Sequence, residues 1–219
     1  MDWASTLREC NAHWKHDGNP KRPYVRLTSG LISNEFYDMS YVMAVPELVD
    51  LAANELASRL RSIIRGNRPA ILCGQMKGSV TLASHIATKS KMSFIFTNKI
   101  GEGADKKMEV DERFVGICNE EQEEIYAVED VVTSASTSVL SCKAAREFGF
   151  KHVADETLCI VNRSGKSEIN GMKIISCYEA PDVVSWKEGF NPFTPNGEEL
   201  VEPVRAKTRD GRIAMHLPM

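Results

Sequence analysis

Two adjacent acids, Glu129 and Asp130, stand directly after an apolar run at residues 125–128 (IYAV) that has the pattern of a buried strand. Carboxylates accept hydrogen bonds, and two neighbouring carboxylates at the end of a strand can hold the vicinal hydroxyls of a ribose. Ligands of parallel α/β sheets bind beyond the carboxyl ends of the strands, where these acids are expected to emerge. The pair is therefore a candidate sugar-binding site.

A run of small, mostly hydroxyl-bearing residues at 133–137 (TSAST) follows the acids. Small side chains let backbone N–H groups approach an anion, and a helix that begins near Ser138 would direct its positive dipole end to the same point. A simpler alternative is a helix-capping run beside two solvated acids. The order of an apolar strand, two acids, two apolar residues and hydroxyls is more demanding than that alternative, and it fits a ribose 5-phosphate.

The elements that must position these residues alternate between strands and helices. Apolar runs predict strands at residues 70–73, 92–97, 114–118, 125–128, 157–161 and 173–177. Helical spacing predicts helices from Pro46 to about Gly66, at 79–88 and at 138–148, and the polar segment 98–113 is expected to be a long mobile loop. This alternation predicts an α/β fold with a central parallel sheet flanked by helices.

The two ends of the chain differ in pattern from the middle. Residues 1–45 mix aromatics with turn formers, including a Thr28-Ser29-Gly30 turn between two short strands, and residues 164–219 are irregular and rich in Pro and Gly. We expect a single domain over residues 1–219, with a binding core at 46–163 and a small hood and appendage formed by the two ends.

The composition limits the class of protein. The 219 residues are 42% hydrophobic and carry a net charge of −3, so a core is expected, and a surface that binds nucleic acid or a membrane is not. The six cysteines form no CxxC pair and several lie in apolar runs, which favours buried, reduced thiols over disulfides or zinc. The first residues lack the pattern of a signal peptide, so a cytoplasmic location is expected.

The segment at 125–139 resembles the PRPP-binding motif of type I phosphoribosyltransferases, where PRPP is 5-phosphoribosyl diphosphate. The resemblance implies that family's fold, with Glu129 and Asp130 on the ribose hydroxyls and Asp130 as a catalytic residue. It also implies Mg²⁺, held by both acids through ribose hydroxyls or water. The 5-phosphate would be held by Val132, Thr133, Ser134, Ala135, Ser136 and Thr137. Ala135 and Ser136 stand where the family often has glycine, so the loop is expected to need an unusual conformation.

Two further segments are similar to orotate phosphoribosyltransferases and concern the base. Residues 25–38 (VRLTSGLISNEFYD) resemble the N-terminal hairpin of those enzymes, which implies that Phe36 and Tyr37 lie over the base. Packing within the hood is the alternative for this pair. Arg163 ends a predicted strand where the orotate enzymes place an arginine, whose guanidinium can donate a fork of hydrogen bonds to the base carboxylate.

The residues expected to face the diphosphate are cations in two loops. Residues 72–78 (LCGQMKG) resemble the family's pyrophosphate loop, which implies Lys77 as a catalytic cation and Gly78 as a PRPP contact. Segment 98–107 occupies the position of the catalytic flexible loop, which implies a second catalytic and PRPP-binding cation at Lys99. In the family this loop often reaches into the neighbouring subunit of a dimer, so a homodimer is expected.

The flexible-loop pattern departs from the family at two positions. The usual second lysine and the histidine fall on Glu102 and Ala104, which carry no positive charge. Lys106 and Lys107 are the candidates to replace them if the loop register has shifted.

The implied reaction is the transfer of the phosphoribosyl group of PRPP to orotate, which gives orotidine 5′-monophosphate and diphosphate. Two alternatives stay open. One is a phosphoribosyltransferase for another nucleobase, because the loop pattern is unusual and Thr28 stands where a lysine is often found. The other is a non-catalytic regulator that binds PRPP or a nucleotide on the same fold.

Overall fold

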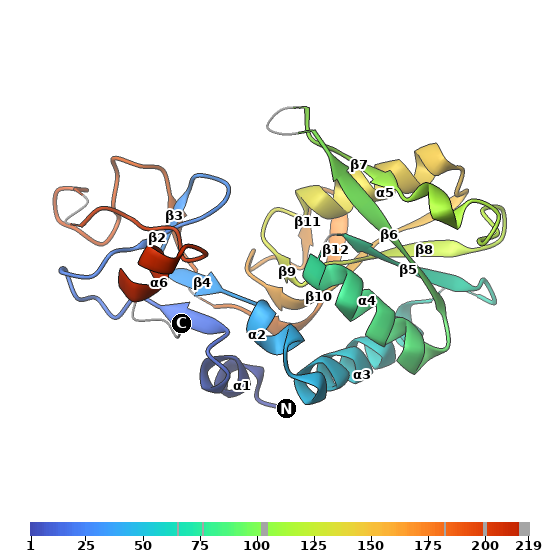
Figure 1. Cartoon of the computed structure of the whole chain (residues 1–219), viewed down its shortest axis with the longest axis horizontal. Coiled ribbons are helices and arrows are strands. Elements are labelled where there is room, and N and C mark those ends of the chain that lie inside the picture. The colour runs from blue at the N-terminus through green and yellow to red at the C-terminus, as the bar shows by residue number, and fades with distance from the viewer. Residues whose placement is uncertain (65, 76, 102–104, 182, 199–200, 215–219) are drawn as a thin grey trace. The chain divides into compact units, whose positions relative to one another are not determined.

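A computed structural model of the chain (Figure 1) describes residues 1–64, 66–75, 77–101, 105–181, 183–198 and 201–214. The chain divides into two compact units: a hood unit of Met1–Tyr41 with Pro181–Met219, and a core unit of Val42–Ala180. The core unit extends past the expected boundary at residue 163, because a strand at Met172–Glu179 belongs to its central sheet.

The core unit is built on a twisted sheet in which five neighbouring strands are parallel, as expected for an α/β fold. In sheet order these are β12 (Met172–Glu179), β10 (His152–Asn162), β8 (Glu124–Val128), β5 (Ala70–Gln75) and β6 (Ser93–Ile100). Short antiparallel strands lie at the edges, β11 (Glu168–Ile169) on β12 and β7 (Lys107–Val110) on β6, and β9 (Val131–Val132) pairs with β10.

Helices cover both faces of this sheet. On one face α5 (Ser136–Phe148) packs its Ala144 and Ala145 against Ile71, Cys73 and other apolar residues of the strands. On the other face lies α4 (Lys77–Ser90), which approaches so closely that a Cβ on Gly74 would be 2.7 Å from the Val80 Cα. Glycine at position 74 is therefore needed for this helix to pack on β5.

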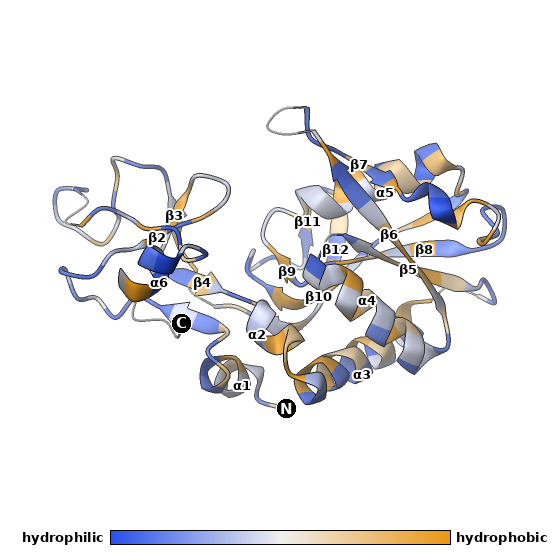
Figure 2. Cartoon of the chain, viewed as in Figure 1, coloured by the Kyte–Doolittle hydropathy of each residue, from blue (hydrophilic) through white to orange (hydrophobic). Residues whose placement is uncertain are grey.

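The helix α3 (Pro46–Ile63) packs beside α4, and its sequence explains its position. Pro46 occupies the first turn, where its missing N–H group is tolerated. One stripe of its apolar residues recurs at helical spacing and is buried, whereas Leu51 is exposed, and Figure 2 shows the alternation of hydrophobic and hydrophilic residues along the helix. The buried stripe consists of Val49, Ala52, Ala53, Leu56, Ala57 and Leu60.

The hood unit contains two small antiparallel sheets. In one, β1 (His13–Lys15) pairs with β4 (Glu35–Tyr37); in the other, β3 (Ile32–Ser33) lies between β2 (Val25–Arg26) and β13 (Ser185–Trp186). The predicted Thr28-Ser29-Gly30 turn joins β2 to β3, and Gly30 has a φ of 85°, which glycine adopts without strain. The hood unit also contains the helices α1 (Trp3–Glu9) and α6 (Arg209–Ala214). The short helix α2 (Ser40–Met43) spans the point in the chain where the hood unit ends and the core unit begins.

Two predictions about the segment after β6 were wrong. Residues 98–113 are not a structureless loop, because β6 runs to Ile100 and β7 returns antiparallel to it, which makes a hairpin. At the start of its tip, Gly101 has a φ of 70°, and a Cβ there would be 2.7 Å from the Asp105 carbonyl oxygen. Residues 114–118 are not a strand, since a short 3-10 helix at Glu112–Phe114 and turns occupy this stretch.

Burial, expected for the cysteines, holds for Cys73, Cys142 and Cys159, whereas Cys10, Cys118 and Cys177 are half-buried. All six are free, and burial raises the pKa of the Cys142 thiol to about 11 and that of Cys73 further. Within the described ranges, no helix has the length and apolar character that crossing a membrane requires.

Candidate functional site

The acids Glu129 and Asp130 emerge at the carboxyl end of β8, as the sequence predicts. Their backbone is fixed to the neighbouring strand β10: the Glu129 N–H donates to the Leu158 carbonyl at 2.9 Å, and the Asp130 carbonyl accepts from the Val161 N–H at 3.2 Å. The two side chains therefore leave the sheet from a rigid position at its centre.

Glu129 is half-buried and directs its carboxylate to the first turn of α5. Its Oε1 atom accepts from the Ser138 N–H at 3.0 Å and from the Ser138 hydroxyl, which also contacts Thr157 Oγ1 at 2.9 Å. Burial raises the pKa of Glu129 to about 7, and the neighbouring Asp130 adds to the rise, while Ser138 and the Lys106 charge oppose it. Glu129 thus satisfies an otherwise orphan N–H group of the helix, and Ser138 is a site residue that the sequence reasoning missed.

Asp130 lies against the start of α4. A Cβ placed on Gly78 would be 2.8 Å from Asp130 Oδ2, and the other carboxylate oxygen accepts from the Val131 N–H at 2.9 Å. The predicted pyrophosphate loop at residues 72–78 is corrected in part, because residues 72–75 belong to β5 and Lys77 and Gly78 already belong to α4, where Lys77 is exposed. Met76 lies outside the described residues. The structure therefore brings the candidate diphosphate segment and the candidate ribose acid together at one edge.

The candidate phosphate loop has the unusual conformation that its alanine predicts. Ala135 adopts a left-handed conformation, with φ 53° and ψ 14°, which costs about 1 kcal/mol in a residue with a Cβ. Its methyl group is buried beside Val132, whereas Thr133, Ser134 and Ser136 are exposed. The Ser134 hydroxyl contacts Ser136 Oγ at 3.1 Å, and Thr137 is half-buried in the first turn of α5.

The lysines of the hairpin separate into three environments. Lys106 places its ammonium 3.4 Å from Thr137 Oγ1, at the start of α5. Lys99 is exposed on β6 opposite Met108. Lys107 forms an ion pair with Glu109, which raises the lysine pKa. The unusual positions Glu102 and Ala104 lie outside the described residues. Among the described lysines of the hairpin, Lys106 is the one whose ammonium contacts the start of α5.

The three candidate base contacts fall in two different units. Arg163 follows β10 in the core unit, where its N–H donates to the Val132 carbonyl at 2.8 Å, next to the phosphate loop. In the hood unit, Phe36 packs with Val25 and Ala206. Tyr37 stacks on His13 with ring centroids 4.3 Å apart. Contact of Phe36 and Tyr37 with a base stays a prediction, and both are buried within the hood.

The donor set fits Mg²⁺ bound mainly by substrate. Among the described residues no group of three or more His, Cys, Asp or Glu could enclose a metal ion. Mg²⁺ in phosphate-transfer sites is typically held by one or two carboxylates together with phosphate oxygens and water. Glu129 and Asp130 supply two carboxylates at the edge of the sheet, which is compatible with that arrangement.

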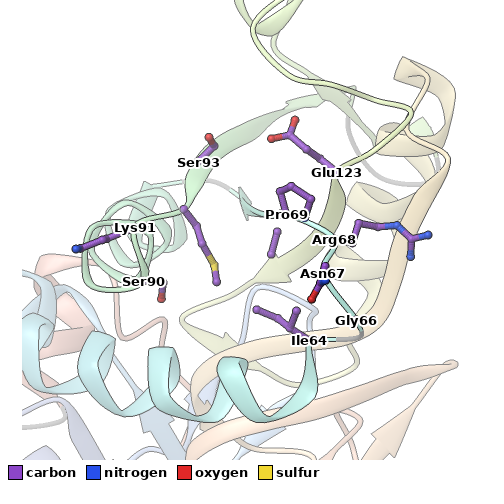
Figure 3. Close-up of a pocket in the computed structure, with 11 residues that line it drawn as sticks. Ile64, Gly66, Asn67, Arg68, Pro69, Ser90, Lys91, Ser93 and Glu123 are labelled. Atoms are coloured by element: carbon purple, nitrogen blue, oxygen red, sulfur yellow. The ribbon is translucent and has the colours of Figure 1, made fainter.

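A pocket of about 390 Å³ lies at the opposite, amino-terminal edge of the sheet, where β5 and β6 begin (Figure 3). Figure 3 shows Arg68 and Lys91 extending to opposite sides, away from the centre near Pro69. The pocket therefore presents no converging cations to an anion, and none of the predicted site residues lines it.

Comparison with known proteins relates this fold to one class of enzyme. No family model matches the chain. An orotate phosphoribosyltransferase of Methanocella arvoryzae is 28% identical over 179 residues, which cover 79% of this chain and 94% of the relative. Further curated relatives with the same name are 24–27% identical.

Solved structures extend the comparison to the fold. The crystal structure of orotate phosphoribosyltransferase from Aeropyrum pernix superposes with a TM-score of 0.60 at 18% identity, over 80% of this chain and 92% of that one. An adenine phosphoribosyltransferase from Rhodothermus marinus gives a TM-score of 0.54 at 14% identity, over 81% and 99%. The expected type I phosphoribosyltransferase fold is therefore confirmed, and the sequence is similar to the orotate enzymes.

Proposed function

We propose that the chain is a phosphoribosyltransferase that transfers the 5-phosphoribosyl group of PRPP to orotate and releases orotidine 5′-monophosphate and diphosphate. The relatives that bear the name of this activity support the proposal. The structural observation that carries it is the meeting of two acids, the start of α5 and the start of α4 at the carboxyl edge of one sheet.

In this proposal the phosphoribosyl group lies across the edge with its two ends recognised separately. Asp130 and Glu129 accept hydrogen bonds from the ribose hydroxyls, and exposed Thr133, Ser134 and Ser136 surround the 5-phosphate at the helix start. Lys106, already beside Thr137, adds a positive charge on the phosphate side. Such positioning suits a reaction in which the ribose becomes an oxocarbenium ion before the base attacks.

The leaving diphosphate requires positive charge on the other side of the ribose. Lys77 at the start of α4 is adjacent to Gly78, which lies against Asp130, so it is suitably placed for this role. Lys99 of the hairpin is the second candidate. Mg²⁺, when bound, would neutralise diphosphate oxygens while Glu129 and Asp130 orient the ribose hydroxyls.

The choice of base rests on fewer residues. Arg163, whose backbone is fixed beside the phosphate loop, is the proposed partner of the orotate carboxylate. Phe36 and Tyr37 are the proposed aromatic contacts. A second candidate function, transfer to a purine or another base, is supported by Thr28 at a position that is often lysine and by the fold likeness to an adenine enzyme.

We also propose a cytoplasmic homodimer that serves pyrimidine biosynthesis and binds neither nucleic acid nor membranes. The net charge of −3 supports the absence of a nucleic-acid partner. Val115 and Ile117 support an interface between copies, because their side chains are 68% and 73% exposed although both are apolar.

The test is diphosphate release from PRPP with Mg²⁺ and each candidate base. We expect release with orotate and none with adenine or hypoxanthine. Turnover with a purine instead of orotate would replace the first function by the second. Tight PRPP binding without turnover of any base would identify the chain as a regulator.

A further inference from the structure

Gln75, the last residue of β5, carries a side chain that the mechanism above does not use. The residue is only 3% exposed. Among the residues that the structure describes, neither its amide nitrogen nor its amide oxygen has a hydrogen-bond partner. Leaving a buried amide unpaired costs on the order of 1–3 kcal/mol, so a side chain in this state calls for an explanation.

The register of the sheet defines what surrounds this amide. Gln75 lies opposite Thr97 on β6, and on the other side Gly74 lies opposite Val128 of β8. One further step along these parallel strands brings Gln75 beside Glu129. Alternation along β5 places Gln75 on the same face as Ile71 and Cys73, which is the face that α5 covers.

Polar side chains form a layer on this face under the first two turns of α5. Thr97 Oγ1 lies 3.0 Å from Ser141 Oγ, and Ser138 joins Glu129 to Thr157. The layer contains Gln75, Thr97, Glu129, Ser138, Ser141 and Thr157. Five of these six residues are buried and Glu129 is half-buried, in a sheet whose neighbouring positions are apolar.

Counting donors and acceptors in the layer indicates what the amide can bind. Thr97 and Ser141 have two hydroxyl hydrogens and use one between them, so one hydrogen is available to the Gln75 carbonyl oxygen. The Glu129 carboxylate can accept about four hydrogen bonds, and Ser138 supplies two. The Gln75 amide nitrogen has two hydrogens to donate. The nearest unfilled acceptor by register is therefore the Glu129 carboxylate.

We propose that Gln75 is a positioning residue that holds the Glu129 carboxylate through one water molecule, and so prepares it for the ribose of PRPP at this edge. The inference rests on the proposed function, because it assigns Glu129 to the ribose. Gln75 holds the carboxylate from strand β5, while Ser138 holds it from helix α5. The carboxylate then faces the ribose hydroxyls in one orientation, and this order is established before the substrate arrives.

A double-mutant cycle tests the proposal with PRPP affinity as the readout, measured by calorimetry with Mg²⁺ and without a base. Gln75→Met keeps the volume and removes the donors. We expect it to weaken PRPP about tenfold in the wild-type protein and less than twofold in Glu129→Gln, because its effect passes through Glu129. Equal losses in both backgrounds would overturn the proposal. Ile71→Val, on the same strand and face but in an apolar environment, controls for altered packing of β5 and leaves PRPP affinity unchanged.

A ligand-free readout separates this inference from the proposed function. If the wild-type protein binds PRPP but no base reacts, the proposed enzyme is wrong and the affinity cycle still decides on Gln75. If it binds no PRPP, urea unfolding decides. A Gln75 that holds Glu129 makes Gln75→Met lower the folding equilibrium constant about fivefold, with no change in the Glu129→Gln background. An increase in the folding equilibrium constant of Gln75→Met would refute the proposal. It would mean that the buried amide has no partner in the folded protein, so that its removal stabilises the fold.

Discussion

Two glutamates in polar surroundings, Glu35 of the hood unit and Glu129 of the core unit, have opposite electrostatic environments. Burial alone would raise the pKa of Glu35, but hydrogen bonds from His13, Lys15 and Tyr37 bring it to about 2. Burial raises the pKa of Glu129 to about 7, because the two hydrogen bonds that its carboxylate accepts come from the neutral Ser138, and Asp130 is nearby.

The difference separates a structural acid from an acid suited to ligand binding. Glu35 contacts the His13 imidazole, the Lys15 ammonium and the Tyr37 hydroxyl within its own unit, so its carboxylate stabilises the hood. Glu129 lies where burial disfavours its ionised form, and groups with pKa values raised in this way are concentrated at functional sites. The two hydroxyl donors of a bound ribose, together with Mg²⁺, would stabilise the ionised form of the Glu129 carboxylate.

The largest effect is expected from neutralising the ribose acids. Glu129→Gln with Asp130→Asn should weaken PRPP binding by more than about 1,000-fold, roughly 4 kcal/mol, while the protein stays folded. Calorimetry measures the affinity, and circular dichroism checks the fold. PRPP affinity equal to that of the wild-type protein would contradict the assignment of both acids to the ribose. Glu129 would then not differ from Glu35 in serving a ligand.

Removing the structural acid should have the reverse pattern. Glu35→Gln takes the carboxylate away from His13, Lys15 and Tyr37, and leaving buried hydrogen-bonding groups unsatisfied costs on the order of 1–3 kcal/mol of unfolding free energy. Urea unfolding measures the loss, and the affinity of the folded protein for PRPP should change less than twofold. A large loss of PRPP affinity without a loss of stability would show that Glu35, too, serves the ligand.

The pH dependence of stability distinguishes the two acids directly. Because the folded-state pKa of Glu129 is above its ordinary value of 4.5, stability falls as pH rises from about 4.5 to 7, by about 3 kcal/mol. Because the pKa of Glu35 is below 4.5, its contribution is present above that pH and is lost as pH falls toward 2. Unfolding in chelator-containing buffers should show the first slope disappear in Glu129→Gln and the second in Glu35→Gln. Unchanged slopes would contradict these environments.

The sequence predicted the core well because its signals are local. The strand–acid–acid–hydroxyl order around Glu129 requires only that β8 ends where its apolar run ends, and the structure agrees. The sequence also indicated an unusual loop conformation, because Ala135 and Ser136 stand where the family often has glycine, and the structure shows that Ala135 is left-handed. Such features depend on a few consecutive residues, so tertiary contacts do not override them.

The sequence could not predict features that depend on distant pairings. The hairpin of β6 and β7 replaces the expected loop at 98–113 because Met108 and Val110 are buried under α5, a contact that a short, charged segment does not reveal. Glu129 and Ser138 are bonded across nine residues, and Gln75 meets its neighbours through sheet register. Alternation at Met108 and Val110 was the signal available for the hairpin.

The smallest expected effect concerns Lys106, a lysine of the hairpin whose charge acts on Glu129. The charge of Lys106 lowers the pKa of Glu129 and so opposes the effect of burial, as Lys15 does for Glu35. The Lys106 ammonium also contacts Thr137. Lys106→Ala should weaken PRPP about fivefold, roughly 1 kcal/mol, because one charge-assisted contact to phosphate is lost. Lys107→Ala is the matched control, since that adjacent lysine pairs with Glu109 and should leave the affinity unchanged. Equal effects of the two changes would indicate a general electrostatic attraction of PRPP to the hairpin. Lys106 would then have no specific role beside Glu129.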